Sequence, residues 1–192
     1  HRSFYTDMAN GYAYETFFVE ELPAKVHELF RVSADPADTF IAGLSMGGYG
    51  AMKLALRHPD RYAAAASLSG AMDVASLVAE PQEWFLNDIR CVFGPGADIR
   101  NTEHDLMHLA YEAGRDPGRY PPLWAWCGTD DFLLTGNRLF RRRAEEAGLA
   151  LTYDEGPGGH DWACWDREIQ RILDWLPLDR DGAEDECPRR GG

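Results

Sequence analysis

Apolar and polar positions along the chain follow two different periods, one typical of short buried strands and the other of amphipathic helices. Short apolar runs predict strands over residues 38–45, 62–70 and 121–128, and LTYDEG (151–156) is predicted as a fourth strand. Helical spacing predicts helices over residues 14–31, 46–59, 136–150 and 161–176, and Pro23 is expected to start or kink the first of them. Residues 71–121 follow neither period, so we expect this stretch to be irregular.

The order of these elements indicates the fold class. Strands that alternate with helices are typical of βαβ units, so we expect an α/β protein with a mainly parallel sheet and helices on both faces. A chain of 192 residues is long enough for one domain with a substantial core, which we assign to residues 1–177. Residues 178–192 include the apolar-poor run DRDGAEDECPRRGG and are predicted to form a disordered tail.

Composition and charge exclude several function classes. Hydrophobic residues make up 45% of the chain and charged residues 27%, as in soluble globular proteins. No apolar run approaches the roughly 18 residues needed to cross a bilayer. The formal net charge of -13 argues against nucleic acid or a membrane surface as a partner, because both attract Lys and Arg. We interpret the spread acidity as a solvated surface.

The four cysteines, Cys91, Cys127, Cys164 and Cys187, are widely separated and form no CxxC pair. Together with the absence of a His-x-x-His pair, this spacing argues against a zinc site. So few cysteines indicate free thiols in a reducing compartment, and we expect a cytoplasmic protein. The chain opens with HRSFYTDM, without an initiating Met or a signal peptide, which predicts a processed chain or a piece of a longer one.

The sequence IAGLSMGGYGAM (41–52) carries the pattern Gly43-x-Ser45-x-Gly47 between a predicted strand and a predicted helix. This is the context of a nucleophile elbow, in which a serine sits on a tight turn with sparsely allowed backbone angles. Small residues two positions away let the strand and the helix pack closely. The pattern therefore predicts that Ser45 is a nucleophile, the alternative being an ordinary serine in a glycine-rich turn.

The residues after Ser45 support this interpretation. The backbone N–H of Met46 lies at the helix start and points to where an oxyanion would form. Gly48 and Gly50 follow early in the helix, although glycine costs about 1 kcal/mol in a helix interior. We expect closely packed neighbours at both glycines.

A nucleophilic serine needs a base, and His160 is the best candidate. It lies in EGPGGHDW, between the fourth predicted strand and the last predicted helix, so it can reach the carboxyl edge of the sheet. His58 is explained by its place at a helix end, and His104 and His108 are expected on one polar helical stretch without metal partners. The remaining histidines are the terminal His1 and His27 on the first predicted helix.

The base needs an orienting acid, which should follow a strand between the serine and the histidine. The sequence CGTDDFLL offers Asp130 and Asp131, and either could cap the next segment instead. Asp154 lies within a predicted strand, and Asp161 is too close to the histidine in sequence to orient it easily. The order Ser, Asp, His is that of the α/β-hydrolase fold.

Five ordered motifs, SFYTDM, GLSMGGYGAM, SLSGAMD, CGTDDFLL and GGHDWACWD, resemble the esterase D-like serine hydrolases, the tributyrin esterase and S-formylglutathione hydrolase group, over about residues 2–176. The resemblance implies an α/β-hydrolase that acts on short acyl esters without a metal or organic cofactor. It implies that Ser45 is the nucleophile, Asp131 the triad acid and His160 the base. Tyr49, where formylglutathione hydrolases usually have histidine, favours the tributyrin esterase branch.

Members of this family carry further strands upstream, ending in an HG-type loop that supplies a second oxyanion N–H, and nothing in this sequence matches that loop. We therefore expect an N-terminally incomplete domain. Loss of one oxyanion donor is expected to cost about a hundredfold or more in rate. The strand at 38–45 is expected to be an exposed apolar edge that could pair with another chain, as in a homo-oligomer.

These observations predict a serine carboxylesterase that hydrolyses short-chain acyl esters of small molecules through an acyl-enzyme. The stretch 71–121 is expected to line the acyl and alcohol pockets, although its aromatic residues could equally be plain core. The alternatives are an acyltransferase of the mycolyltransferase type and a non-catalytic hydrolase scaffold. Acyl glycerides, acetylated or feruloylated sugars and formylglutathione all fit as the natural ester.

Overall fold

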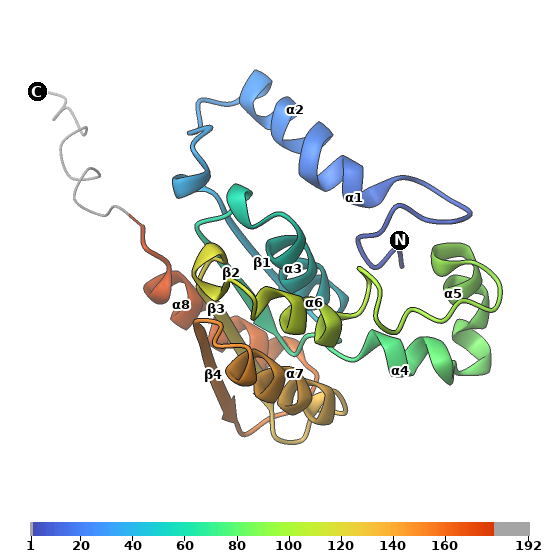
Figure 1. Cartoon of the computed structure of the whole chain (residues 1–192). Coiled ribbons are helices and arrows are strands. Elements are labelled where there is room, and N and C mark those ends of the chain that lie inside the picture. Colours follow the sequence, from blue (N-terminus) through green and yellow to red (C-terminus); the bar gives the residue numbers. More distant parts are fainter. Residues whose placement is uncertain (1, 179–192) are drawn as a thin grey trace, which may run out of the picture.

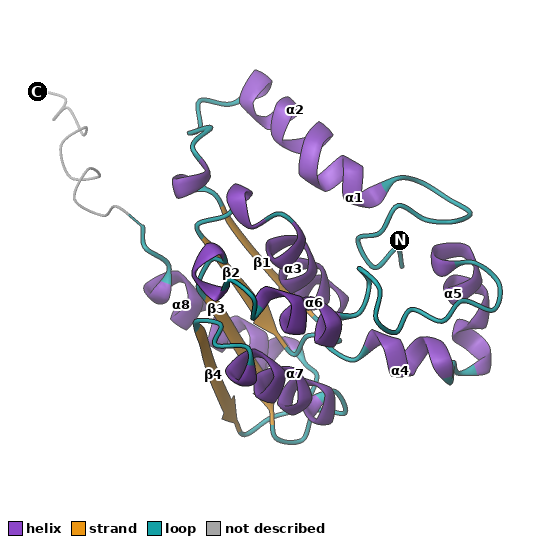
Figure 2. Cartoon of the chain, in the orientation of Figure 1, coloured by secondary structure: helices purple, strands orange, loops and turns teal. Residues whose placement is uncertain are grey.

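Four strands pair in chain order to form one parallel sheet (Figures 1 and 2). The structure, a computed structural model, describes residues 2–178. The strands are β1 (Phe40–Leu44), β2 (Ala64–Leu68), β3 (Leu123–Gly128) and β4 (Leu151–Gly156). Each neighbouring pair is parallel, with Phe40 opposite Ala64 at the start of β1 and β2. The predicted strands and their parallel arrangement are confirmed, whereas the predicted tail lies outside the described residues apart from Leu178.

Helices cover both faces of this sheet (Figure 1). On one face lie α3 (Met46–Arg57) and α7 (Leu134–Glu146), with α6 (Leu106–Ala113) packed against both. The other face carries α8 (Trp162–Trp175). Because side chains alternate along a strand, Ala65 joins the core on the α3 side while Ala66 and Leu68 join the core beneath α8. Burial on both faces explains why the central strands β2 and β3 are mostly apolar, whereas the edge strand β4 includes Asp154 and Glu155.

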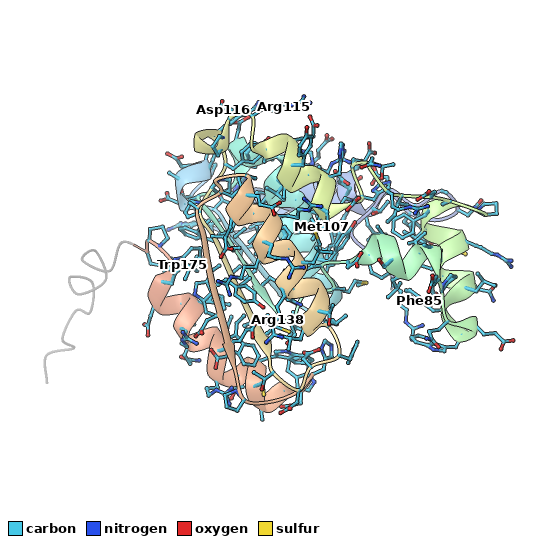
Figure 3. The ribbon with its side chains drawn as sticks, turned by 60° about the horizontal axis from the view of Figure 1, so that its bottom comes forward. Phe85, Met107, Arg115, Asp116, Arg138 and Trp175 are labelled. Carbon is cyan, nitrogen blue, oxygen red and sulfur yellow. The ribbon has the colours of Figure 1, made fainter. Side chains whose placement is uncertain are left out.

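The expectation that residues 71–121 are irregular is wrong. This stretch contains α4 (Val74–Ala79), α5 (Leu86–Phe93) and α6, and Phe85, just before α5, lies in a lobe set apart from the sheet (Figure 3). Each helix has only six to eight residues, so the apolar period is too short to stand out. The starts of α4 and α6 are instead defined by N-caps, since Asp73 accepts from the Ser76 N–H and Asp105 from the Met107 N–H.

The first predicted helix forms as one helical run with an interruption before its proline. The run consists of α1 (Tyr14–Thr16), the π-helical turn η1 (Phe17–Glu21) and α2 (Leu22–Leu29). The N–H of Leu22 donates to the Phe17 carbonyl, five residues back, and Pro23 has no N–H to donate. Pro23 lies at the second position of α2, directly after the π-helical turn, so the expectation that it starts a helical segment is confirmed. The shorter 3₁₀ turns are Pro36–Asp38, Pro59–Arg61, Glu83–Phe85 and Pro117–Arg119.

The first strand, β1, lies at an edge of the sheet. Within residues 2–178, β1 pairs only with β2, and a groove of about 310 Å³ lies between β1 and α8, bordered by Leu44, Trp162 and Ile169. The predicted place of this strand at an edge is thus confirmed, while pairing with another chain stays a prediction.

The described cysteines, Cys91, Cys127 and Cys164, are free thiols, as expected. No helix between residues 2 and 178 is both long and apolar enough to span a membrane.

A buried lysine joins the nucleophile helix to the N-terminal segment. The side chain of Lys53, in α3, is fully buried, and its Nζ lies 2.8 Å from Glu15 Oε2. The same amine donates to the Tyr5 carbonyl at 3.0 Å and to Thr6 Oγ1 at 2.9 Å. A buried charge is tolerated only when its partners replace water, and here three acceptors do so. Lys53 thereby fixes α1 and the turn at Tyr5 against α3.

Glu15 is the carboxylate at the centre of this cluster. It also lies 2.8 Å from Arg57 Nε and 3.0 Å from His58 Nε2, at the end of α3. Burial by itself would raise the pKa of Glu15, but the hydrogen bonds of His58 and Lys53 and the positive charges of Lys53 and Arg57 outweigh it and lower the pKa to about 2. The ionised carboxylate is therefore part of the folded structure at neutral pH.

We expect Glu15→Gln to lower the free energy of unfolding by about 2–3 kcal/mol at pH 7, a difference that disappears in acid. A carboxylate whose pKa is lowered by folding stabilises above its unfolded pKa, near 4.5, and loses that stabilisation as the pH falls toward 2. Urea denaturation of the wild type and of Glu15→Gln at several pH values between 7 and 2.5 measures this difference in the free energy of unfolding.

The control is Glu28→Gln, which removes an exposed ion pair with Lys25 and should change the free energy of unfolding by less than about 0.5 kcal/mol. A Glu15→Gln difference that stays constant from pH 7 to pH 2.5 would contradict the assignment.

Candidate active site

Ser45 lies on a strained turn between β1 and α3. Its backbone angles are φ 54° and ψ -120°, in the left-handed half of backbone space that residues with a side chain rarely adopt. Two hydrogen bonds to the segment at and beyond the end of β2 hold it there. The Ser45 N–H donates to the Leu68 carbonyl at 2.9 Å, and the Ala71 N–H donates to the Ser45 carbonyl at 3.0 Å. The predicted backbone strain at Ser45 is confirmed.

The glycine two positions before Ser45, Gly43, is required by close backbone approach. A Cβ at Gly43 would collide with the backbone carbonyl group of Gly47, so no other residue fits at the end of β1. This contact brings the first turn of α3 directly against the strand. The serine is therefore held above the carboxyl edge of the sheet by backbone packing.

The two later glycines also have the close neighbours that we expected. A Cβ at Gly48 would collide with Ser67 Oγ, and one at Gly50 would collide with the ring of Tyr5. The turn that carries Tyr5 is the one anchored by Lys53. Close packing on two sides of α3 thus explains why these positions have glycine although glycine destabilises a helix.

His160 connects Ser45 to Asp131. Its Nε2 lies 2.9 Å from Ser45 Oγ, and its Nδ1 lies 2.9 Å from Asp131 Oδ2. The other carboxylate oxygen of buried Asp131 accepts from the Leu133 N–H at 2.8 Å. Because an ionised carboxylate only accepts, Nδ1 carries the proton and Nε2 is left to accept from the serine hydroxyl. The structure thus brings together all three residues predicted from the sequence.

The structure also separates Asp131 from the other carboxylates that the sequence offered. Asp130 is exposed, and Asp154 forms an ion pair with Arg171 at 2.7 Å. Asp161 caps α8 by accepting from the Cys164 N–H at 3.1 Å. Among these four, Asp131 alone meets the imidazole within hydrogen-bonding distance.

Met46 is the first residue of α3, directly after the serine. The first N–H groups of a helix have no acceptor within it, and the helix dipole places partial positive charge there. The Met46 N–H therefore remains the predicted oxyanion donor beside Ser45.

Two further histidines, His58 and His104, have structural surroundings. His58 is the C-cap of α3 and contacts Glu15. His104 lies before α6 rather than on it, so the expectation that it shares a helix with His108 is wrong. Burial and the charge of Lys53 lower the pKa of His104 to about 4.

Tyr49, which the resemblance singled out, is fully buried beneath the site. Its hydroxyl donates to the His104 carbonyl at 2.8 Å, and its ring packs edge-on against Phe4 at 5.7 Å. Burial raises the pKa of Tyr49, so its phenol stays protonated. The side chain therefore supports α3 from within the core.

Aromatic residues beside His160 were missed by the sequence reasoning. The ring centroid of Phe132 lies 4.7 Å from that of the imidazole, and Trp165 meets the imidazole edge-on at 4.8 Å. Trp162 in turn packs edge-on against Trp165 at 5.3 Å. The available signal was the position of Phe132 directly after the candidate acids and of two Trp residues just after His160.

In residues 2–178, no three His, Cys, Asp or Glu side chains are grouped closely enough to hold a metal ion.

Comparison with known proteins places these observations in a family context. A family model described as "Putative esterase" matches residues 4–176. An acetyl esterase of Caldicellulosiruptor saccharolyticus is 30% identical, over 91% of this chain and 68% of the relative. The diacylglycerol acyltransferase/mycolyltransferase Ag85A of Mycobacterium gordonae is 26% identical, over 88% of this chain and 58% of its own length.

Two solved structures from Staphylococcus aureus are similar throughout the fold. The fluorophosphonate-binding serine hydrolase FphF has 34% identity and a TM-score of 0.84, covering 93% of this chain and 69% of its own. The S-formylglutathione hydrolase FrmB has 34% identity and a TM-score of 0.79, and the match covers 92% of this chain and 68% of FrmB. The expected α/β-hydrolase fold and the resemblance to esterase D-like serine hydrolases are thereby confirmed.

We expect Gly43→Ala to lower the free energy of unfolding by about 2–3 kcal/mol, because the added methyl group forces β1 and α3 apart. Gly118→Ala is the matched control, since a Cβ there meets no atom within 4 Å. Urea denaturation of the two variants checks this, and an equal stability of both would show that the backbones at Gly43 and Gly47 are not in contact.

Proposed function

The chain belongs to the esterase family whose model it matches over residues 4–176, and on that premise we propose that it is a serine carboxylesterase working through an acyl-enzyme. The observation that carries the proposal is the continuous pair of hydrogen bonds from Ser45 through His160 to Asp131. A serine hydroxyl at neutral pH becomes nucleophilic only when a base takes its proton, and this arrangement supplies both the base and its orienting acid.

In the acylation step, Ser45 Oγ attacks the ester carbonyl carbon while its proton moves to His160 Nε2. The carbonyl electron pair moves onto oxygen, and the N–H of Met46 with the positive end of α3 stabilises the resulting oxyanion. The carbon–oxygen bond to the alcohol then breaks, and its electron pair goes to the alcohol oxygen, which takes the proton from His160. The alcohol leaves, and the acyl group stays on Ser45.

Deacylation repeats these steps with water. His160 takes a proton from water as the oxygen attacks the acyl carbonyl, and the same donors stabilise the second oxyanion. The bond to Ser45 Oγ then breaks and the serine recovers its proton from His160. Throughout both halves, Asp131 holds the imidazole in the required tautomer and balances its charge when it is protonated.

We propose short-chain acyl esters of small molecules as the substrates. The acetyl esterase and S-formylglutathione hydrolase among the relatives carry one- or two-carbon acyl groups in their names, which supports this size class. The triad as placed requires no cofactor for the reaction. Because the chain spans 68% of the acetyl esterase, the natural substrate is itself part of the proposal.

A second candidate is acyl transfer to an alcohol. The similarity to diacylglycerol acyltransferase/mycolyltransferase Ag85A supports it, although at 26% identity. The two candidates share the acyl-enzyme and differ only in whether water or an alcohol accepts the acyl group. Product analysis with a competing alcohol separates them.

Ser45→Ala is expected to lower kcat for 4-nitrophenyl acetate by about 10⁴-fold or more and to abolish labelling by a fluorophosphonate probe, because the nucleophile is removed. Hydrolysis is followed by released nitrophenol, and labelling by mass spectrometry of the modified peptide. Ser33→Ala, in an exposed loop, is the control and should keep both properties. Equal hydrolysis and labelling by wild type and Ser45→Ala would refute the proposed function.

Asp131→Asn is expected to lower kcat by about 10³- to 10⁴-fold, because an amide no longer specifies the tautomer in which Nε2 accepts from Ser45. Asp130→Asn removes the neighbouring exposed carboxylate and should leave kcat for the uncharged 4-nitrophenyl acetate within about twofold, since the imidazole is bonded to Asp131 and not to Asp130. Steady-state kinetics of the pair measure this. A larger loss of kcat in Asp130→Asn than in Asp131→Asn would show that Asp131 is not the acid of the triad.

A further inference from the structure

The chemistry of the proposed reaction determines where the alcohol part of the ester must lie. When the tetrahedral intermediate collapses, the bond from carbon to the alcohol oxygen breaks and that oxygen receives the proton on His160 Nε2. The alcohol oxygen therefore has to come within hydrogen-bonding reach of Nε2. Whatever group is attached to this oxygen lies beside the imidazole.

Two aromatic side chains flank that imidazole, and they differ in exposure. Trp165 meets it edge-on at 4.8 Å and is buried in the first turn of α8, on the side that faces the core. Phe132 lies at 4.7 Å with the ring planes tilted by 48°, and 77% of its surface is exposed. Trp165 therefore supports the imidazole from inside, while Phe132 offers an open apolar surface next to the reacting atoms.

We propose that Phe132 is a specificity-determining residue that receives the alcohol part of the ester, and that this part is an uncharged ring. The inference rests on the function proposed above. A ring group attached to the alcohol oxygen can stack or pack edge-on against the exposed face of Phe132, a contact that an ethyl group provides only in part. Trp162, which is 72% exposed and packs on Trp165, extends the aromatic surface beyond His160.

The charges around the aromatic surface exclude an anionic alcohol. The segments that carry it, residues 128–137 and 156–166, contain Asp130, Asp131, Asp161 and Asp166 but no Lys or Arg. The cations that directly follow these segments, Arg138 and Arg167, are already bonded to Glu155 and Glu168, each at 2.8 Å. A negatively charged leaving group would be repelled by these carboxylates without gaining a counter-charge.

Phe132 has no structural reason for its exposure in the described part of the chain. It follows Asp131, whose carboxylate is fixed by the Leu133 N–H, and Leu133 packs against the core. The acid and the core contact are thus provided by the two neighbours of Phe132. The phenyl ring is left free to contact a ligand.

The experiment compares esters that share an acetyl group and differ in the alcohol. For Phe132→Ala, kcat/KM for benzyl acetate should fall about 5- to 10-fold relative to kcat/KM for ethyl acetate, the range expected for loss of one aromatic contact. Phe132→Tyr keeps the ring and should keep the ratio of the wild type. Trp84→Ala removes an exposed aromatic residue that stacks with Arg2 away from the site, and it should also keep the wild-type ratio of kcat/KM for the two esters.

A second comparison tests the charge. The wild type should hydrolyse phenyl acetate with a higher kcat/KM than 4-carboxyphenyl acetate, and the difference should narrow in Asp130→Asn and as salt is raised, because the repulsion is screened. Equal rates for the two phenyl esters at low salt would overturn the claim that the preferred alcohol is uncharged.

The outcomes also separate this inference from the proposed function. An equal loss on benzyl and ethyl acetate in Phe132→Ala would mean that the ring only positions His160, and no loss on either would mean that the alcohol lies elsewhere. Both results overturn the inference while the wild type remains active and labelled by a fluorophosphonate. A wild type that neither hydrolyses acetates nor is labelled would overturn the proposed function and this inference with it.

Discussion

The contact between the end of β1 and the first turn of α3 is the constraint on which the site depends. At Gly43 the backbone of Gly47 leaves no room for a Cβ, and between these two glycines Ser45 adopts the left-handed region. A residue held there costs of order 1–3 kcal/mol, which the surrounding structure must offset. The hydrogen bonds of Ser45 to Leu68 and Ala71 do so from β2 and the segment after it. The hydroxyl and the neighbouring N–H of Met46 are both oriented by this one turn.

The helix that begins at this turn connects the site to the rest of the domain. Its first turns pack on Tyr5 through Gly50, and its middle holds the fully buried amine of Lys53. Its end contributes Arg57 to the same carboxylate, Glu15, that Lys53 contacts. A buried ion pair of this kind contributes little net stability compared with an apolar pair, but it specifies one arrangement of the N-terminal segment against α3. The position of the nucleophile is therefore supported from several distant parts of the chain.

The site itself is assembled at the carboxyl edge of the sheet from loops far apart in sequence. Ser45 and His160 are 115 positions apart, and His160 and Asp131 are 29 positions apart. Parallel strands bring their following loops to the same edge. There the Asp130 N–H donates to the Gly158 carbonyl at 3.0 Å, which joins the loops that carry Asp131 and His160. The aromatic side chains of Phe132 and Trp165 then enclose the imidazole, and the carboxylates around them set the local charge. Geometry and charge together define which esters suit the site.

Much of the fold and of the site follows from local patterns in the sequence, because those patterns act through the backbone. Local patterns located all four strands, three of them as apolar runs, and the helices α3, α7 and α8. The spacing of Gly43, Ser45 and Gly47 indicated a turn in which Gly43 leaves no room for a Cβ. The same reasoning failed for residues 71–121, where the helices have only six to eight residues. There α4 and α6 begin at Asp caps, and α5 has no side-chain cap. It also left Asp130 and Asp131 equivalent until a resemblance was invoked, and it passed over Phe132. Only the tertiary structure distinguishes these residues, since whether a side chain is buried against His160 or exposed beside it depends on how strands distant in sequence approach one another.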